Sequence, residues 1–256
     1  MSIHHTQKSV NSQPEAGVFL IYKKPGETLA VLVERFRFEN NISKDTPVTY
    51  AGRLDPMAEG LVLLLTSEAC KRKEEFLGLG KTYVFEVLFG VATDTFDMLG
   101  KIISSLDFLP TEEQISESLE KIKNTKSFSY PPFSSKPVDG LPLFVHAKAG
   151  TLPSELPLVD GEIKEINLKN LRTAYLPEAI KEKIEIIQKV EGDFRQKEII
   201  EGWQKFLESK KNSRCMVATF EATVSSGVYI RTLSTMFDGP ALAYSIERTK
   251  VGDLSL

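Results

Sequence analysis

The chain has 256 residues, which suits one large domain or two small ones and is ample for a substantial buried core. Hydrophobic residues make up 41% and charged residues 26%, as in ordinary soluble globular proteins, so the composition argues against a disordered or fibrous chain. The formal net charge of -3 argues against a protein that coats nucleic acid through its overall field, but a local cluster of Lys and Arg remains compatible with phosphate binding.

The cysteines and the N-terminal residues indicate the compartment. Cys70 and Cys215 lie far apart and in no metal-binding spacing, which is typical of reduced thiols in a reducing environment. The first residues lack the apolar core of a signal peptide, and no apolar run approaches the roughly 18 residues of a membrane span. We therefore expect a cytoplasmic protein without a membrane partner, whose polar residues 1–16 form a flexible tail.

The first third of the chain predicts two strands and a helix. VFLIY (18–22) has the composition of a strand, and Thr28 is a suitable N-cap for a helix whose apolar residues fall on one face. The polar stretch TYAGRLDPMAEG (49–60) follows and contains a single carboxylate next to a proline, Asp55. LVLLLT (61–66) is apolar throughout, which predicts a strand covered on both faces and makes Asp55 part of a loop that leads into the interior.

The middle of the chain alternates between regular elements and loops. We expect a helix around 68–77 and a strand over 81–90, where apolar residues alternate. Thr111 and Gln114 have the spacing of a capping box, which predicts an amphipathic helix over 111–122. The region 127–150 is rich in Pro, Ser and Gly and indicates a long ordered loop or insertion.

The last third predicts further strands and helices without a regular beta-alpha-beta alternation. In chain order, we expect a strand over 162–172, helices near 177–190 and 195–209, a strand over 216–224, a helix that begins within VYIRTLSTMF after an SSG turn, and a short final strand around 249–254. There are no internal repeats or heptads. The pattern predicts a mixed α+β domain.

Several common kinds of site are disfavoured. The three histidines leave no plausible zinc site, because two of them lie in the polar tail. The sequence has no Walker loop, no GxGxxG after a strand and no GxSxG elbow. Metal, nucleotide-dependent and serine hydrolase chemistry are therefore disfavoured.

Three remaining residues are of types that suit a site for a flat polar substrate. Asp55 lies in a glycine-flanked loop, Tyr83 comes early in a strand, and Arg231 follows a turn. An Arg favours the charged form of a nearby carboxylate, and an aromatic ring offers a stacking surface. Spacing alone is weak support, because an Asp before Pro is a common turn residue, a Tyr is ordinary in a strand, and an Arg often belongs to a structural ion pair.

Matching sequence blocks from about residue 17 to residue 252 supply a stronger signal. They read KPGET (24–28), AGRLDPMAEGLVLLLTSEACK (51–71), KTY (81–83) with GVATDTFDMLG (90–100), PPFSSKPVDGLPLFVHAKAG (131–150) and SSGVYIRTL (225–233). In this order and at these separations they resemble the bacterial tRNA pseudouridine synthases of the TruB type. A single block occurs easily by chance, whereas the ordered set does not.

The resemblance implies a pseudouridine synthase fold, with a mixed, mainly antiparallel central sheet flanked by helices. One catalytic domain is expected over 17–256, with an insertion at about 124–150 that grips RNA. The implied reaction needs no metal and no small-molecule cofactor: the glycosidic bond of a uridine breaks, the uracil turns within the site, and a carbon-carbon bond forms. The implied substrate is the uridine at position 55, in the T arm of tRNA, and we expect a monomer.

The resemblance also implies a role for each matching residue. Asp55 matches the essential Asp, acting as nucleophile or as base on the sugar; Tyr83 matches the stacking Tyr; and Arg231 matches the Arg that pairs with the Asp. A base that leaves its stack costs a few kcal/mol, which the pocket must replace. Further substrate contacts are expected from Lys24, Tyr50, Arg53, Leu54, Lys136, Tyr229 and Arg248. The charge run Lys71, Arg72 and Lys73 is explained equally well as a solvated face.

The chain departs from the family's pattern in three places. Tyr50 stands where family members have a His, and a Tyr cannot carry its positive charge. The AGRLD spelling also resembles the RsuA and RluA types of pseudouridine synthase. From the resemblance, we also expect a protein without the C-terminal PUA domain that family members often have. Two alternatives therefore stay open: a pseudouridine synthase acting on ribosomal RNA, and a non-catalytic RNA-binding chaperone of tRNA folding.

Overall fold

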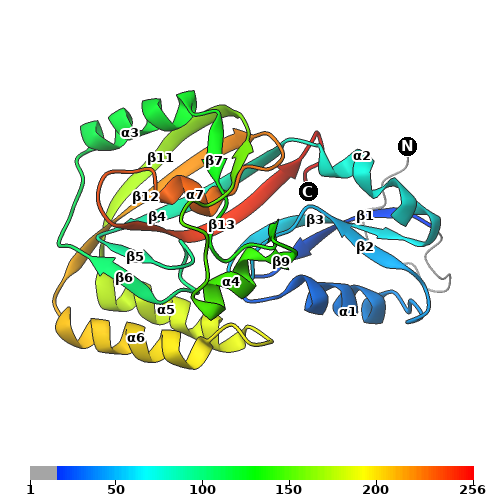
Figure 1. Cartoon of the computed structure of the whole chain (residues 1–256), viewed down its shortest axis with the longest axis horizontal. Helices are drawn as coiled ribbons and strands as arrows, with labels where there is room; N and C mark the ends of the chain where they lie inside the picture. Colours follow the sequence, from blue (N-terminus) through cyan, green and yellow to red (C-terminus); the bar gives the residue numbers. More distant parts are fainter. Residues whose placement is uncertain (1–15) are drawn as a thin grey trace.

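The structure is a computed structural model that describes residues 16–256 (Figure 1). The tail predicted over residues 1–16 lies outside the described residues, apart from its last residue. None of the helices in the described part of the chain is long and apolar enough to cross a membrane.

A twisted seven-stranded sheet forms the centre of the molecule, in the order β1-β3-β13-β4-β12-β11, with β2 paired to β3. The strands are β1 (Val18–Lys23), β2 (Val48–Ala51), β3 (Glu59–Thr66), β4 (Lys81–Phe89), β11 (Ile163–Tyr175), β12 (Arg214–Val224) and β13 (Ala241–Val251). All pairs are antiparallel except β13 with β3. The predicted α+β class and mainly antiparallel mixed sheet are confirmed.

The helices begin close to where the local sequence indicates, except that the helix at Leu143–Ala149 lies in a region predicted as a loop or insertion. They are α1 (Leu29–Glu39), α2 (Lys73–Leu77), α3 (Glu112–Asn124), α4 (Leu143–Ala149), α5 (Leu176–Lys189), α6 (Gln196–Ser209) and α7 (Ile230–Ser234), with a 3-10 helix η1 (Ser67–Arg72) before α2. The Thr28 hydroxyl caps α1, and Thr111 and Gln114 form the predicted capping box of α3. The single helix predicted over 68–77 is instead divided between η1 and α2.

Helices cover both faces of the sheet. One face packs against α1, α3 and α7, through buried residues such as Leu32, Ile115 and Leu233. The other packs against α5 and α6 in one half, through residues such as Trp203, and against α2 in the other half. The side chains of β3 alternate between these two cores, so the prediction that this strand is covered on both faces is confirmed.

The central strand β13 was predicted wrongly. The sequence indicates only a short strand around 249–254, whereas β13 runs from Ala241 to Val251 between β3 and β4. The strand has alanines at alternate positions at its start and carries Glu247, Arg248 and Lys250, which are typical of surface positions. Arg248 is nevertheless 1% exposed, because its side chain hydrogen-bonds backbone groups of the neighbouring loop.

The parallel contact between β3 and β13 depends on Gly60. Gly60 pairs with Arg248 and has a φ of +107°. A Cβ at this position would lie 2.3 Å from the carbonyl oxygen of Arg248 and 2.5 Å from its nitrogen. Only glycine permits this approach without a backbone shift, and the approach holds the end of the Asp55 loop against β13.

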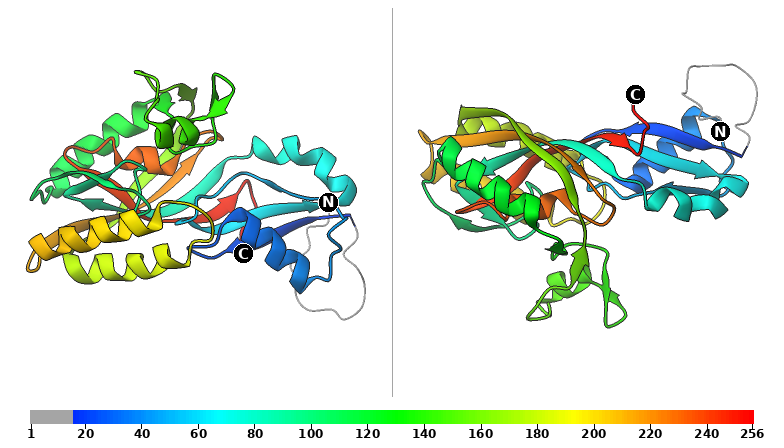
Figure 2. Two further views of the ribbon diagram at one scale, coloured as in Figure 1. Left: turned by 60° about the horizontal axis from the view of Figure 1, so that its bottom comes forward. Right: turned by 90° about the horizontal axis from the view of Figure 1, so that it is seen from above.

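Two accessory regions extend from the sheet. The hairpin of β5 (Val91–Thr93) and β6 (Ile102–Ser105) follows β4 directly. The region predicted as an insertion contains α4 and the short strands β7 (Ser127–Ser129), β8 (Pro137–Val138) and β9 (Leu141–Pro142), and β7 pairs with β10 (Leu158–Asp160). Figure 2 shows that the part with α4 and β9 projects away from the body of the molecule.

Candidate active site

Asp55 lies in the loop that joins β2 to β3. The loop turns at Gly52, whose φ is +84°, and closes through a hydrogen bond of 3.1 Å from the Ala58 N–H to the Asp55 carbonyl. The Asp55 side chain is 30% exposed. The loop therefore presents this carboxylate to solvent at the margin of the core.

Arg231, on the short helix α7, holds the Asp55 carboxylate through both oxygens. Its Nε donates to Oδ2 at 2.6 Å and its Nη2 to Oδ1 at 3.1 Å, although the residues are 176 positions apart in sequence. The Arg231 side chain is only 3% exposed. This fork-to-carboxylate geometry fixes the side-chain conformation of Asp55.

A second carboxylate, Asp97, lies behind the pair. Its Oδ2 is 3.7 Å from Arg231 Nε, and its Oδ1 accepts from the Thr95 hydroxyl and the Leu99 N–H. Burial, aided by the charge of Asp55 and opposed by that of Arg231, raises the pKa of Asp97 to about 6. Burial lowers the pKa of Arg231, but Asp55 and Asp97 outweigh it and raise that pKa above its ordinary value.

The remaining donors of Arg231 bind two backbone carbonyls. Nη1 donates to the Thr95 carbonyl at 2.6 Å, and Nη2 also donates to the Phe133 carbonyl at 3.3 Å. These carbonyls belong to the β5–β6 hairpin and to the insertion, respectively. Three separate segments of chain thus meet at one guanidinium.

Two aromatic rings and a lysine contact one another, and one of the rings, that of Tyr229, interacts with Asp55. The rings of Tyr229 and Tyr130 meet edge to face, with centroids 5.6 Å apart, and the Lys136 ammonium lies 5.2 Å from the Tyr130 centroid. Burial raises the pKa of Tyr229, and the charge of Asp55 raises it further, against the opposing charges of Arg231 and Arg53. The predicted site residues Tyr229 and Lys136 are therefore linked to each other through Tyr130.

Two buried cations support the loop from beneath. Arg248 donates from Nε to Leu61 O at 2.6 Å and from its other nitrogens to the carbonyls of Arg53 and Gly52. Lys23, which is fully buried, donates to the carbonyls of Lys24, Pro56 and Ala58. This geometry favours a supporting role for Arg248 over the direct substrate contact that the sequence led us to expect.

Lys23 provides a prediction about pH. Burial lowers its pKa from 10.5 to about 8, although the charges of Glu27 and Asp55 partly oppose this. Below about pH 8, Lys23 is charged although it is buried, which lowers the free energy of unfolding. This loss of stability disappears as the pH approaches about 10.5. We expect the free energy of unfolding of the wild type to rise by about 3 kcal/mol over this interval relative to Lys23→Met.

Urea denaturation of both proteins at about pH 7.5 and 10.5 measures this difference. Lys181→Met, at an exposed position of α5, is the matched control and should follow the wild type. Parallel curves for the wild type and Lys23→Met would contradict the proposed burial of a charged amine.

The other predicted site residues surround this centre. Leu54 and Tyr83 are 8% and 7% exposed and belong to one buried cluster, and Tyr83 pairs with Arg248 across β4 and β13. Lys24 is exposed next to the turn whose Gly26 N–H donates to Pro56 O. None of these contacts joins the three side chains directly to the Asp55 carboxylate.

Tyr50 and Arg53 form a small cationic-aromatic group at the start of the loop. The Arg53 guanidinium lies 5.9 Å from the centroid of the Tyr50 ring. The Lys73 ammonium, on α2, lies 5.6 Å from the same centroid. Cations at such distances are attracted to the ring face. Tyr50 carries no charge, but its ring holds two positive charges, those of Arg53 and Lys73, close to the start of the loop.

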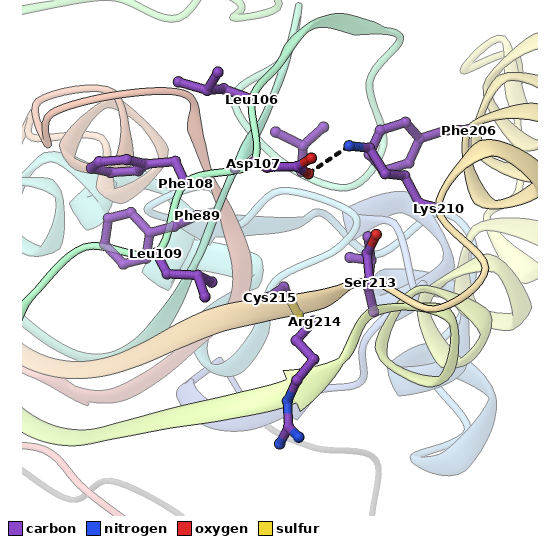
Figure 3. Close-up of a pocket in the computed structure, with 13 residues that line it drawn as sticks. Phe89, Leu106, Asp107, Phe108, Leu109, Phe206, Lys210, Ser213, Arg214 and Cys215 are labelled. Carbon is purple, nitrogen blue, oxygen red and sulfur yellow. Dashed lines mark hydrogen bonds and ion pairs between the residues drawn. The ribbon is translucent and has the colours of Figure 1, made fainter.

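A cavity lies in another part of the molecule. It has a volume of about 260 Å³ and is lined mainly by apolar residues from β4, the segment after β6, and α6 (Figure 3). The Lys210–Asp107 ion pair at its edge leaves the Asp107 side chain 82% exposed to solvent. The candidate site is therefore identified by the buried arginine and its carboxylates rather than by cavity size.

Reasoning from sequence missed Asp97, Lys23 and Tyr130. Asp97 lies within the block GVATDTFDMLG, which also contains Asp94, and nothing in the sequence shows which of the two is buried. Lys23 adjoins the block KPGET, and the sequence predicts a substrate contact from the exposed Lys24 of that block instead. The signal that could have distinguished Lys23 is its place at the end of the apolar strand β1.

A carboxylate that is fixed by a buried guanidinium and still open to solvent can act as a nucleophile or as a base on a bound substrate.

Residues 40–186 match the family described as TruB family pseudouridylate synthase (N terminal domain). The tRNA pseudouridine synthase B of Caldicellulosiruptor saccharolyticus is 33% identical over 160 residues, which cover 62% of this chain and 54% of that protein. The protein of the same name from Aquifex aeolicus is 30% identical over 166 residues, covering 63% and 57%.

The chain spans about half the length of the curated relatives it matches. Among solved structures, a chain from "Crystal Structure of a Cbf5-Nop10-Gar1 Complex" aligns with a TM-score of 0.52 and 15% sequence identity, over 93% of this chain and 49% of that one. At this identity, the likeness shows the fold alone.

Proposed function

Because the chain belongs to the TruB family of pseudouridylate synthases, we propose that it isomerises uridine to pseudouridine at position 55, in the T arm of tRNA. The observation that carries this proposal is the partly exposed Asp55 carboxylate, whose two oxygens accept hydrogen bonds of 2.6 Å and 3.1 Å from the buried Arg231 guanidinium. The names of the two bacterial relatives support tRNA as the substrate.

The chemistry assigned to the site needs one fixed carboxylate and a pocket for a base. Asp55 acts on the sugar of the flipped uridine, as nucleophile or base, while the glycosidic bond breaks and the uracil turns. Arg231 fixes the orientation of the carboxylate. Tyr83 and Tyr229, with Leu54, supply apolar and stacking surface for the flipped base. This contact offsets the stacking energy of about a few kcal/mol that the base loses when it leaves the RNA.

RNA contacts around this pocket are assigned to cations. Lys24, Arg53, Lys73 and Lys136 are exposed or half-buried and carry no carboxylate partner among the ion pairs of residues 16–256. Such groups hold phosphates without reading sequence. We propose that residues 17–256 act as one catalytic domain, monomeric and cytoplasmic, whose insertion at about 124–150 grips the RNA.

Mapping of pseudouridine in RNA tests the function. The purified protein is incubated with a T-arm stem-loop, with a T-arm variant that has cytidine at the target position, and with ribosomal RNA fragments. Chemical mapping of pseudouridine should show product at the target uridine of the first RNA alone. Product in ribosomal fragments alone would favour the alternative substrate, and absence of product from all uridine-containing RNAs would favour the non-catalytic chaperone.

We expect affinity for T-arm RNA to fall steeply with salt despite the net charge of -3. If the four assigned cations each neutralise one phosphate, the Kd should rise by roughly 50-fold between about 50 and 200 mM salt. Lys136→Gln should flatten the slope of log Kd against log salt by about one unit, whereas Lys181→Gln on α5 should not. Filter binding or anisotropy titrations measure the slope, and a flat wild-type profile would exclude the proposed phosphate contacts.

A further inference from the structure

The linker between α5 and α6 contains an arginine in an unusual conformation. Arg195 has a φ of +64°, in the left-handed region that side chains other than glycine rarely adopt. The Asp193 carboxylate accepts from the Arg195 N–H, and Gln196 donates to the carbonyls of Val190 and Gly192. The linker is thus ordered by its own side chains around a strained residue.

The Arg195 side chain holds the β5–β6 hairpin through Asp94. Its two terminal nitrogens donate to the two Asp94 oxygens at 2.6 Å and 3.1 Å, with the side chains 16% and 24% exposed. Asp94 also accepts from the Lys101 N–H across the hairpin. The next residue is Thr95, whose carbonyl accepts from Arg231 Nη1.

The same guanidinium also holds the insertion. The Arg195 guanidinium carbon lies 4.0 Å from the centroid of the Phe133 ring, a distance typical of a stacked cation-π contact. The Phe133 carbonyl accepts from Arg231 Nη2. Both backbone carbonyls that bind Arg231 therefore belong to segments that Arg195 fixes.

We propose that Arg195 is a positioning residue for the Asp55–Arg231 pair. By joining Asp94 to Phe133, it fixes the Thr95 and Phe133 carbonyls and hence the plane of the Arg231 guanidinium, which in turn orients the Asp55 carboxylate. Its catalytic consequence rests on the proposed pseudouridine synthase function. A lysine cannot replace it, because only the planar fork both binds a carboxylate through two nitrogens and stacks on a ring.

Two variants of Arg195 and a matched control test this proposal. Arg195→Met removes both contacts, and Arg195→Lys keeps the charge without the fork. Arg172→Met removes another arginine-carboxylate pair, that of Arg172 with Glu86 at 3.0 Å on the sheet, and is the control. We expect kcat for pseudouridine formation to fall roughly 10- to 100-fold in Arg195→Met, with Kd for T-arm RNA within threefold, only partial rescue in Arg195→Lys, and no change in Arg172→Met.

A second readout does not depend on activity. Hydrogen exchange of the Arg231 Nε–H, followed by NMR, should be slow in the wild type and in Arg172→Met and at least tenfold faster in Arg195→Met. Unchanged kcat together with unchanged exchange in folded Arg195→Met would overturn the proposal, even if its thermal stability were lower. If the wild type makes no pseudouridine while Arg195→Met still speeds the exchange, the proposed function fails and the positioning role stands.

Discussion

Replacing Asp55 with Asn should abolish pseudouridine formation, with a loss of at least about 10³-fold in kcat. The amide keeps the size of the side chain and one oxygen that accepts from Arg231. It can act neither as a base nor as a nucleophile, however, so the chemical step loses its principal group. The measurement is pseudouridine formed from T-arm RNA under single-turnover conditions.

Controls separate a chemical loss from a folding defect. Asp97 lies 3.7 Å from Arg231 Nε and remains to balance its charge in Asp55→Asn, so this variant should fold and bind T-arm RNA within threefold of the wild type. Asp107→Asn, which alters an exposed carboxylate at the cavity of Figure 3, should keep full activity. Full activity in Asp55→Asn would refute the assignment of this residue.

Replacing Arg231 with Met should lower the free energy of unfolding by about 3–5 kcal/mol, because it leaves the buried Asp97 without its cation. The loss should grow with pH. The pKa of Asp97 is already raised to about 6 in the wild type, so its ionisation costs stability as the pH rises through that value. Without Arg231 this pKa rises further, and the gap between the two proteins should therefore be larger at about pH 8 than at about pH 5.

Urea denaturation at these two pH values measures the gap. The double variant Arg231→Met, Asp97→Asn removes the unpaired charge and should recover part of the stability, most clearly at the higher pH. A gap that does not depend on pH, or a double variant no more stable than the single one, would contradict the account of Asp97 as a carboxylate balanced by Arg231.

Much of the fold follows from local sequence signals. The helix α3 is predictable because Thr111 and Gln114 satisfy backbone donors at its first turn, and β4 because its apolar residues alternate. β13 was missed because one of its faces carries two alanines and an arginine in place of larger apolar residues. Arg248 is buried only because the neighbouring loop offers two carbonyls and β3 a third, and such partners are set by tertiary contacts.

The same limit applies to the site. Asp55 and Arg231 are distant in the sequence, and only the resemblance of whole blocks predicts that they pair; in the structure their side chains are in contact. Asp97 and Lys23 could not be distinguished from surface charges, because burial of a charged group depends on hydrogen bonds from elsewhere in the chain. Arg195 carries no sequence signal, since its two contacts come from different segments.

The central place of β13 has a consequence for the order of events during synthesis. Strands β3 and β4 both appear within the first 90 residues, yet the strand that fills the gap between them ends at Val251. Until that strand emerges from the ribosome, the Asp55 loop lacks Arg248 beneath it, and β4 has no partner on the edge that β13 later covers. The nascent chain therefore holds an incomplete sheet, open to aggregation, until residue 251 has been made.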